Sequence, residues 1–157
     1  MKSDGFTLLE LIIVIIVIGV LTSLALPRLF SAIESSRGAE ALSAMASIRS
    51  RMDTCVLMNP TEAYNKYLPC DNFDILGMED PGTAPGAHFR YEIWPFVEEK
   101  GYYVIVAFRN SLDGGSNDRA DRIKLEYLDT HHSKGLSIRG YGVFSNIRQS
   151  SGPWRSP

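Results

Sequence analysis

The chain has 157 residues, of which 45% are hydrophobic and 22% are charged, and its formal net charge at pH 7 is −2. This length fits one membrane helix and one compact domain of about 100 residues, and it excludes a pair of enzymatic domains. The near-neutral charge offers nucleic acid no general electrostatic attraction.

The N-terminal apolar run is long enough to cross a bilayer, since about 20 helical residues span a hydrocarbon core of about 30 Å. From Leu8 to Leu26 its one strongly polar side chain is Glu10, and Thr22 and Ser23 are able to bond back to the helix. A carboxylate inside such a segment costs roughly 2.5–3.5 kcal/mol on insertion scales, so it usually has a partner. We therefore expect Glu10 to need a cation.

The sequence Gly5-Phe6-Thr7-Leu8-Leu9-Glu10, followed by Gly19 and Pro27 with apolar spacing, resembles the N-terminal signature of type IV pilins and type II secretion pseudopilins. The resemblance implies that a prepilin peptidase cuts between Gly5 and Phe6 and methylates the new N-terminus at Phe6. Residues 1–5 would be a leader peptide and 6–27 the transmembrane and polymerisation helix. Glu10 of an incoming subunit would pair with the Phe6 amine of a neighbour.

An ordinary secretory signal is removed together with its apolar region, and residues 1–5 are too short to be one. The mature protein is thus expected to keep its anchor, although Asp4 departs from the family pattern, which usually has a basic or neutral residue there. The expected location is the inner membrane, single-pass with a cytoplasmic N-terminus, and after assembly an extracellular or periplasmic filament. The implied partners are other pilin subunits, the prepilin peptidase, an inner-membrane assembly platform and inner-membrane lipid. An ordinary signal anchor is the alternative.

Residues 28–58 continue the helix with a one-sided apolar pattern. That pattern consists of Phe30, Ile33, Ala41, Met45, Ile48, Met52 and Val56. Pro27 should bend the helix, and Gly19 and Gly38 soften it. In the resemblance Gly19 and Pro27 bracket a stretch that extends on filament entry; the alternative is a simple kink at the membrane exit. The helix should end near Asn59-Pro60.

Residues 59–87 read as the helix-to-sheet connection, with a short helical turn over Glu62–Leu68 capped by Thr61 or a neighbour, and an extended loop over Pro69–Gly86. Cys55 and Cys70 are the two cysteines, and an even pair in an exported domain predicts a disulfide. It would close about 16 residues and contribute roughly 3 kcal/mol. Two free thiols are the alternative.

Residues 88–157 alternate in the manner of strands with one buried face. The strand patterns are Phe89–Trp94, Val104–Phe108 with Val104, Val106 and Phe108 on one face, Ile123–Tyr127, and a fourth within Leu136–Ile147. Breaks at 99–101 and 110–121 predict hairpin connections. The expected fold is α+β: an antiparallel sheet of about four strands packed against the second half of a long N-terminal helix, with 28–157 as one globular domain.

The acidic segment with Asp113, Asn117, Asp118 and Asp121 has oxygen ligands that suit calcium, and major pseudopilins hold calcium with a late loop. The spacing is not that of an EF-hand, and Arg119 and Arg122 neutralise the same carboxylates, so a solvated hairpin without metal or other cofactor is favoured. His131 and His132 have no nucleophile or metal-spaced companion, and an enzyme is not expected. Tyr102, Tyr103, Tyr127, Tyr141 and Trp154 would serve either as a stacking surface, as in a DNA-uptake pilin, or more often as packing residues.

The sequence therefore predicts a structural subunit that polymerises through residues 6–27 into a type IV pilus, for adhesion, motility or DNA uptake. A type II secretion pseudopilin is the alternative within the family. A minor pilin or membrane-anchored binding subunit is the alternative of another class. Nucleic acid is an expected partner only for an uptake pilin.

Overall fold

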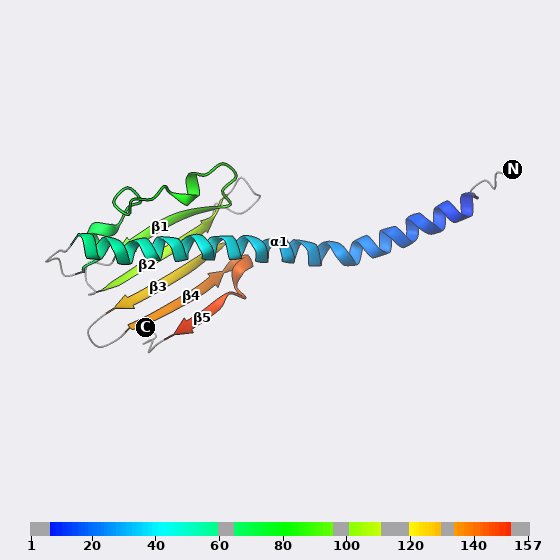
Figure 1. The fold of residues 1–157 in the computed structure, drawn as a ribbon. Helices are drawn as coiled ribbons and strands as arrows, with labels where there is room; N and C mark the ends of the chain where they lie inside the picture. Colours follow the sequence, from blue (N-terminus) through cyan, green and yellow to red (C-terminus); the bar gives the residue numbers. More distant parts are fainter. Residues whose placement is uncertain (1–6, 60–64, 96–100, 111–119, 130–133, 152–157) are drawn as a thin grey trace. The chain divides into compact units, whose positions relative to one another are not determined.

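The computed structural model describes residues 7–59, 65–95, 101–110, 120–129 and 134–151. The chain forms two compact units, Met1–Ser36 and Arg37–Pro157. One helix, α1 (Leu8–Met58), contributes residues to both units, and a five-stranded sheet belongs to the second (Figure 1).

In the first unit α1 is exposed on all sides: every residue from Thr7 to Ile33 is accessible to solvent. The helix runs through Pro27 without interruption. Proline has no backbone N–H, so α1 lacks one backbone hydrogen bond at this position. The expected bend at Pro27 stays a prediction.

In the second unit α1 packs one stripe of side chains against the sheet. The buried residues recur at three- or four-residue intervals: Gly38, Ala41, Met45, Ile48, Met52 and Cys55. The predicted apolar face was wrong at Phe30 and Ile33, which are 62% and 39% exposed. Both lie before Arg37, in the first unit, whereas the buried stripe begins at Gly38.

The helix ends as predicted, at Met58. The side-chain and backbone nitrogens of Asn59 both donate to the Cys55 carbonyl, at 3.2 and 2.8 Å. These two bonds satisfy a carbonyl that the end of a helix would otherwise leave open.

The sheet is a five-stranded antiparallel meander with strand order β1-β2-β3-β4-β5. Its strands are β1 (Phe89–Pro95), β2 (Tyr102–Arg109), β3 (Arg122–Asp129), β4 (Lys134–Tyr141) and β5 (Arg148–Ser151). The α+β fold and the antiparallel hairpins are confirmed, with one strand more than predicted. The extra strand, β5, is Arg-Gln-Ser-Ser and fully exposed, so it has no apolar alternation from which to predict it.

The two faces of the sheet differ in what covers them. The face towards α1 carries the main core, including Phe89, Tyr91, Ile93, Tyr103, Ile105, Ala107, Ile123 and Leu125. Val104, Val106 and Phe108 form a separate buried cluster with Trp94 and Tyr102 on the opposite face. The prediction of a single buried face in β2 was therefore wrong: both faces of this second strand are buried.

The connection between α1 and β1 is more structured than predicted. It contains two 3-10 turns, η1 (Leu68–Cys70) and η2 (Pro81–Thr83), and Leu76 is buried with 5% exposure. A Cβ added at Gly82 would lie 3.1 Å from the Phe89 carbonyl oxygen, so η2 lies directly against the backbone of β1. Thr61 and Glu62, the predicted start of a helical turn, lie outside the described residues.

A third 3-10 turn, η4 (Gly142–Phe144), follows β4 and packs against α1. A Cβ added at Gly38 would lie 3.4 Å from the Phe144 ring and 3.0 Å from Ile147. Gly38 therefore allows the helix to approach this turn closely, a packing role in addition to the flexibility expected of it.

Candidate functional site

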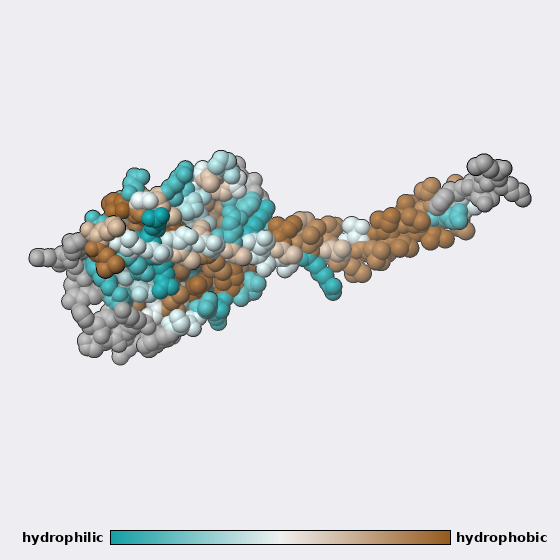
Figure 2. Space-filling model, viewed as in Figure 1, coloured by the Kyte–Doolittle hydropathy of each residue, from teal (hydrophilic) through white to brown (hydrophobic). Residues whose placement is uncertain are grey.

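The exposed apolar surface of α1 in the first unit is the most unusual surface of the described residues. Leu8 is 76% exposed, and the aliphatic side chains that follow, up to Leu29, are between 41% and 68% exposed. Figure 2 shows these apolar side chains along the N-terminal part of α1. Soluble monomers rarely leave a continuous apolar surface of this size open to water. The surface therefore requires lipid or other protein around it.

Among the described residues α1 is the one helix long and apolar enough to cross a membrane. Its first half has no core of its own to enter, since none of its most apolar 18-residue window is buried. Together with the prepilin-like sequence Gly5-Phe6-Thr7-Leu8-Leu9-Glu10 that precedes and begins it, this helix supports anchoring of the chain in a membrane.

The side chain of Glu10 folds back on the start of the helix. The backbone nitrogen and the hydroxyl of Thr7 both donate to Glu10 Oε2, at 2.9 and 2.8 Å, and the Glu10 nitrogen donates to Thr7 Oγ1 at 3.3 Å. This reciprocal pattern is a capping box, in which residue N-cap and residue N3 satisfy each other's backbone donors. Glu10 Oε1 accepts no hydrogen bond from the described residues.

Thr7 is the functional residue that the sequence reasoning missed. Its signal was present as Thr7-Leu8-Leu9-Glu10 directly before an apolar run, which is the capping-box pattern. The expectation of a cation for Glu10 stays a prediction, because it concerns a group on another subunit.

Further along the apolar segment, the two hydroxyl side chains bond back to the helix as predicted. Thr22 Oγ1 donates to the Ile18 carbonyl at 2.8 Å, and Ser23 Oγ donates to the Val20 carbonyl at 2.9 Å. Both hydroxyls are thereby satisfied without water, which suits an apolar surrounding.

The other residues of the predicted assembly segment are only partly within the described chain. Gly5 and Phe6 lie outside the described residues. Gly19 lies on the exposed helix, and a Cβ added there would meet nothing within 4 Å. No packing contact among the described residues therefore requires a glycine at this position. Pro27 is inside α1, seventeen residues after Glu10.

The predicted disulfide is confirmed: Cys55 and Cys70 are bonded, with their Cα atoms 6.2 Å apart. The bond joins the last turn of α1 to η1, and both residues are buried, at 3% and 0% exposure. It therefore fixes the start of the connecting segment on the helix before the chain enters the sheet.

A cluster of tyrosines lies in the same core. The rings of Tyr67 and Tyr103 are 4.6 Å apart, and the Arg49 guanidinium lies 4.7 Å from the Tyr127 ring centroid. Burial raises the pKa of Tyr67 and of Tyr103 well above the usual value. These rings serve packing, as the sequence analysis favoured for most of its aromatic residues.

The predicted calcium candidates are mostly outside the described chain, as are His131 and His132. Asp113, Asn117 and Asp118 lie outside the described residues. Asp121 is described, and its Oδ1 accepts a hydrogen bond from the Val143 nitrogen at 3.0 Å. No group of three or more metal-binding side chains occurs among the residues that the structure describes. Asp121 therefore has a structural partner in η4.

Comparison with known proteins gives one match to a protein family and several matches to individual proteins. Residues 1–26 match the family described as "Prokaryotic N-terminal methylation motif". The chain is also 27% identical over 121 residues to type II secretion system core protein G of Dickeya chrysanthemi, which covers 60% of this chain and 77% of that protein.

Two further relatives match shorter regions. Type II secretion system core protein G of Escherichia coli K12 is 40% identical over 84 residues, 54% of each chain. Type IV major fimbrial protein FimA of Dichelobacter nodosus is 41% identical over 59 residues, 36% of this chain and 38% of that protein. The last two matches thus span about half or less of the relatives' length. No solved structure matches the chain significantly.

Proposed function

We propose that this chain, which is similar to type IV pilins and type II secretion pseudopilins, is a structural subunit that polymerises through its N-terminal helix into a type IV pilus filament. The observation that carries the proposal is the exposed apolar segment of α1 with one carboxylate, Glu10, at its start. Membrane lipid covers this surface before assembly, and the helices of other subunits cover it afterwards. Neither role requires catalysis by this chain.

In this proposal a prepilin peptidase cuts between Gly5 and Phe6 and methylates the Phe6 amine. The methylated amine keeps its positive charge and loses one hydrogen-bond donor. It pairs with Glu10 of a neighbouring subunit, and in a low-dielectric surrounding an unpaired partner would cost several kcal/mol. The pair thus sets the register of one helix against the next.

The capping box supports this role by holding the carboxylate in one orientation. Thr7 supplies two donors to Oε2, whereas Oε1 accepts no hydrogen bond from the described residues. One oxygen therefore fixes the side chain, and the other is open to an incoming amine. A group that is held before binding loses less conformational entropy when its partner arrives.

Gly19 and Pro27 are proposed to bracket a stretch of α1 that extends when the subunit enters the filament. The segment between them is helical in the structure, with the hydroxyls of Thr22 and Ser23 bonded to it. Pro27 supplies no backbone donor, so opening the helix there breaks fewer hydrogen bonds than elsewhere.

A type II secretion pseudopilin is the second candidate. The observation that favours it is the length of the match to the secretion protein of Dickeya chrysanthemi, 121 residues against 59 for the fimbrial protein. We place the pilus first because the acidic segment that ends at Asp121 does not have the spacing of an EF-hand loop and contains Arg119, with Arg122 directly after it.

The test is intact-mass and N-terminal peptide mass spectrometry on sheared filaments and on membranes of the same cells. An N-terminus at methylated Phe6 that is abundant in the sheared fraction supports the pilus subunit. Processed protein confined to the membrane supports the pseudopilin or a minor subunit. An intact Met1 leader in both fractions refutes the proposal and leaves Glu10 without its cation.

A further inference from the structure

The hydroxyl of Tyr103 is a buried polar group without a hydrogen-bond partner among the described residues. Tyr103 lies on the face of β2 that meets α1, and it is 0% exposed. A buried hydroxyl that loses its bonds to bulk water and gains none in return destabilises the fold. Phenylalanine would fill the same space without this cost, so the hydroxyl indicates a bound partner.

A second buried group of the same kind lies on α1, across the interface between helix and sheet. Arg49 Nε is buried and likewise has no hydrogen-bond partner among the residues that the structure describes. The Arg49 guanidinium lies 4.7 Å from the centroid of the Tyr127 ring, and that ring lies 5.1 Å from the ring of Tyr103. The two unpaired groups therefore border the same part of the core.

Charged side chains of α1 act on the Tyr103 hydroxyl. Burial is the main cause that raises the pKa of Tyr103, Asp53 raises this pKa further, and Arg49 lowers it. Arg49 and Asp53 are one helical turn apart, so they lie on the same side of α1. The hydroxyl is thus close to a polar side of the helix although its ring is in the core.

A neighbouring buried polar side chain, Asn65, is paired directly within the protein. Asn65 is 0% exposed, its Nδ2 donates to the Tyr102 carbonyl at 2.7 Å, and its Oδ1 accepts from the Tyr67 nitrogen at 3.0 Å. Most buried polar groups of proteins are paired in this way or by an ordered water. Tyr103 and Arg49 lack the first kind of partner, which favours the second.

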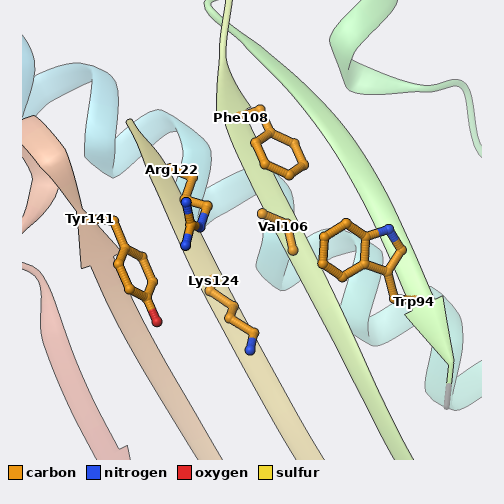
Figure 3. A pocket seen from close by; sticks show the side chains of 6 residues that line it. All are labelled: Trp94, Val106, Phe108, Arg122, Lys124 and Tyr141. Carbon is orange, nitrogen blue, oxygen red and sulfur yellow. The ribbon is translucent and has the colours of Figure 1, made fainter. Parts of the chain in front are cut away.

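The hollow on the opposite face of the sheet differs from this interface. It has a volume of about 250 Å³ and is lined by Trp94, Val106, Phe108, Arg122, Lys124 and Tyr141 (Figure 3). Its cations already have partners, since Lys124 pairs with Glu126 at 2.7 Å and Arg122 lies 4.3 Å from the Tyr141 ring centroid. Within the described ranges, no residue that lines it has a buried side-chain atom without a hydrogen bond. The need for a bound molecule is therefore in the core and not in the hollow.

We propose that an internal water molecule is bound between α1 and β2, where it accepts a hydrogen bond from Arg49 Nε and bonds to the Tyr103 hydroxyl. An internal water typically makes about three hydrogen bonds to groups that would otherwise be unpaired. Water suits this pair because Nε–H only donates, whereas a hydroxyl both donates and accepts. An anion suits it less well, since the negative charge of Asp53 also acts on the hydroxyl. The proposal concerns the second unit alone, so it does not rest on polymerisation.

The direct test is a rotating-frame nuclear Overhauser spectrum of the isotope-labelled full chain in non-ionic detergent. The Arg49 Hε proton should show a cross-peak to the water resonance with the sign of a through-space contact and not of proton exchange. Tyr103→Phe should abolish this cross-peak, because the water then loses one of its partners. The matched control Tyr127→Phe removes the hydroxyl of the neighbouring, less buried ring and should keep the cross-peak.

Urea denaturation gives a second measurement, in which the sign of the effect is informative. With water bound, Tyr103→Phe should raise the unfolding constant roughly fivefold, because a net hydrogen bond is lost. This effect should be smaller in the Arg49→Met background, since the two side chains share one water. It should be unchanged in the Arg51→Met background, where the replaced arginine is exposed.

Three results would overturn the proposal. The first is a wild type without the cross-peak together with a lower unfolding constant in Tyr103→Phe, which would show that the hydroxyl is simply unpaired. The second is full additivity of Tyr103→Phe and Arg49→Met, which would show that the two groups share no ligand. The third is a wild-type stability that depends on chloride at constant ionic strength and loses this dependence in Tyr103→Phe, which would assign the site to an anion. Because the cross-peak is measured on the wild type, a variant that fails to fold leaves the test intact.

Discussion

Replacing Glu10 by glutamine separates the charge of this residue from its capping role. Glutamine at N3 also completes a capping box, so Glu10→Gln keeps the bonds with Thr7 and removes the negative charge. Thr7→Val does the reverse, because it deletes the hydroxyl bonds of 2.8 and 3.3 Å and leaves the carboxylate. Glu10→Ala removes both functions.

The two losses differ in size. Losing a helix N-cap costs about 0.5–2 kcal/mol, and α1, with 51 residues, does not depend on it to remain helical. Leaving the amine of a neighbour unpaired in an apolar surrounding costs about 3 kcal/mol or more, which corresponds to at least a roughly 100-fold weaker subunit contact. The charge should therefore dominate assembly.

The assay is the yield of sheared filaments relative to membrane-bound subunit, quantified by immunoblot in cells expressing each variant. Glu10→Gln and Glu10→Ala should both lose nearly all filament, whereas Thr7→Val should retain most of it. Mass spectrometry of the membrane fraction checks that each variant is processed at Phe6, so that a failure to assemble is distinguished from a failure to be cut.

The reasoning would be refuted by full filament yield with Glu10→Gln together with loss in Thr7→Val. That outcome would make capping of α1 the function of both residues. Equal yield in all three variants would show that neither the charge nor the cap contributes to assembly.

Three further predictions concern the second unit. Replacing Cys55 and Cys70 by serine should lower the free energy of unfolding by about 3 kcal/mol, since the bond closes a segment with a sequence separation of 15, and urea denaturation with and without reductant measures it. Ile48→Ala should lower it by about 2–5 kcal/mol because Ile48 is 0% exposed, whereas Ser47→Ala on the exposed side should change it little by the same assay. Burial raises the pKa of Tyr91 to about 12 from 10.0, so the stability that its neutral form contributes should be complete below pH 10 and lost as the pH rises through 12. Ultraviolet titration of the wild type against Tyr91→Phe measures that pKa, and a normal value for the missing tyrosine would contradict the burial argument.

The sequence was sufficient for the features that local chemistry determines. Asn59-Pro60 ends a helix whatever surrounds it, and α1 ends at Met58. The two cysteines pair because one lies on the last turn and the other on η1. The alternation in Phe89–Trp94 and Ile123–Tyr127 gave the strands β1 and β3.

The predictions of which side chains are buried were wrong where burial depends on contacts between elements that are distant in the sequence. In β2 the residues 103–108 are all apolar or aromatic, so alternation does not reveal which face meets the helix, and Tyr103, Ile105 and Ala107 do so. Phe30 follows the helical period but lies in the unit without the sheet. The need of Glu10 for a partner was predictable from a carboxylate in an apolar run, whereas its bonds with Thr7 depend on the local geometry at the start of α1.

The short polar strand β5 makes one edge of the sheet a poor partner for the sheet of another subunit. A sheet edge with open backbone groups is a template for pairing with another chain, and exposed charges on a short edge strand discourage such pairing. β5 has four exposed residues beginning with Arg148, and at the opposite edge η2 lies against the backbone of β1. In the proposed filament, subunits would therefore not join sheet to sheet, and their contacts would be left to the N-terminal helices.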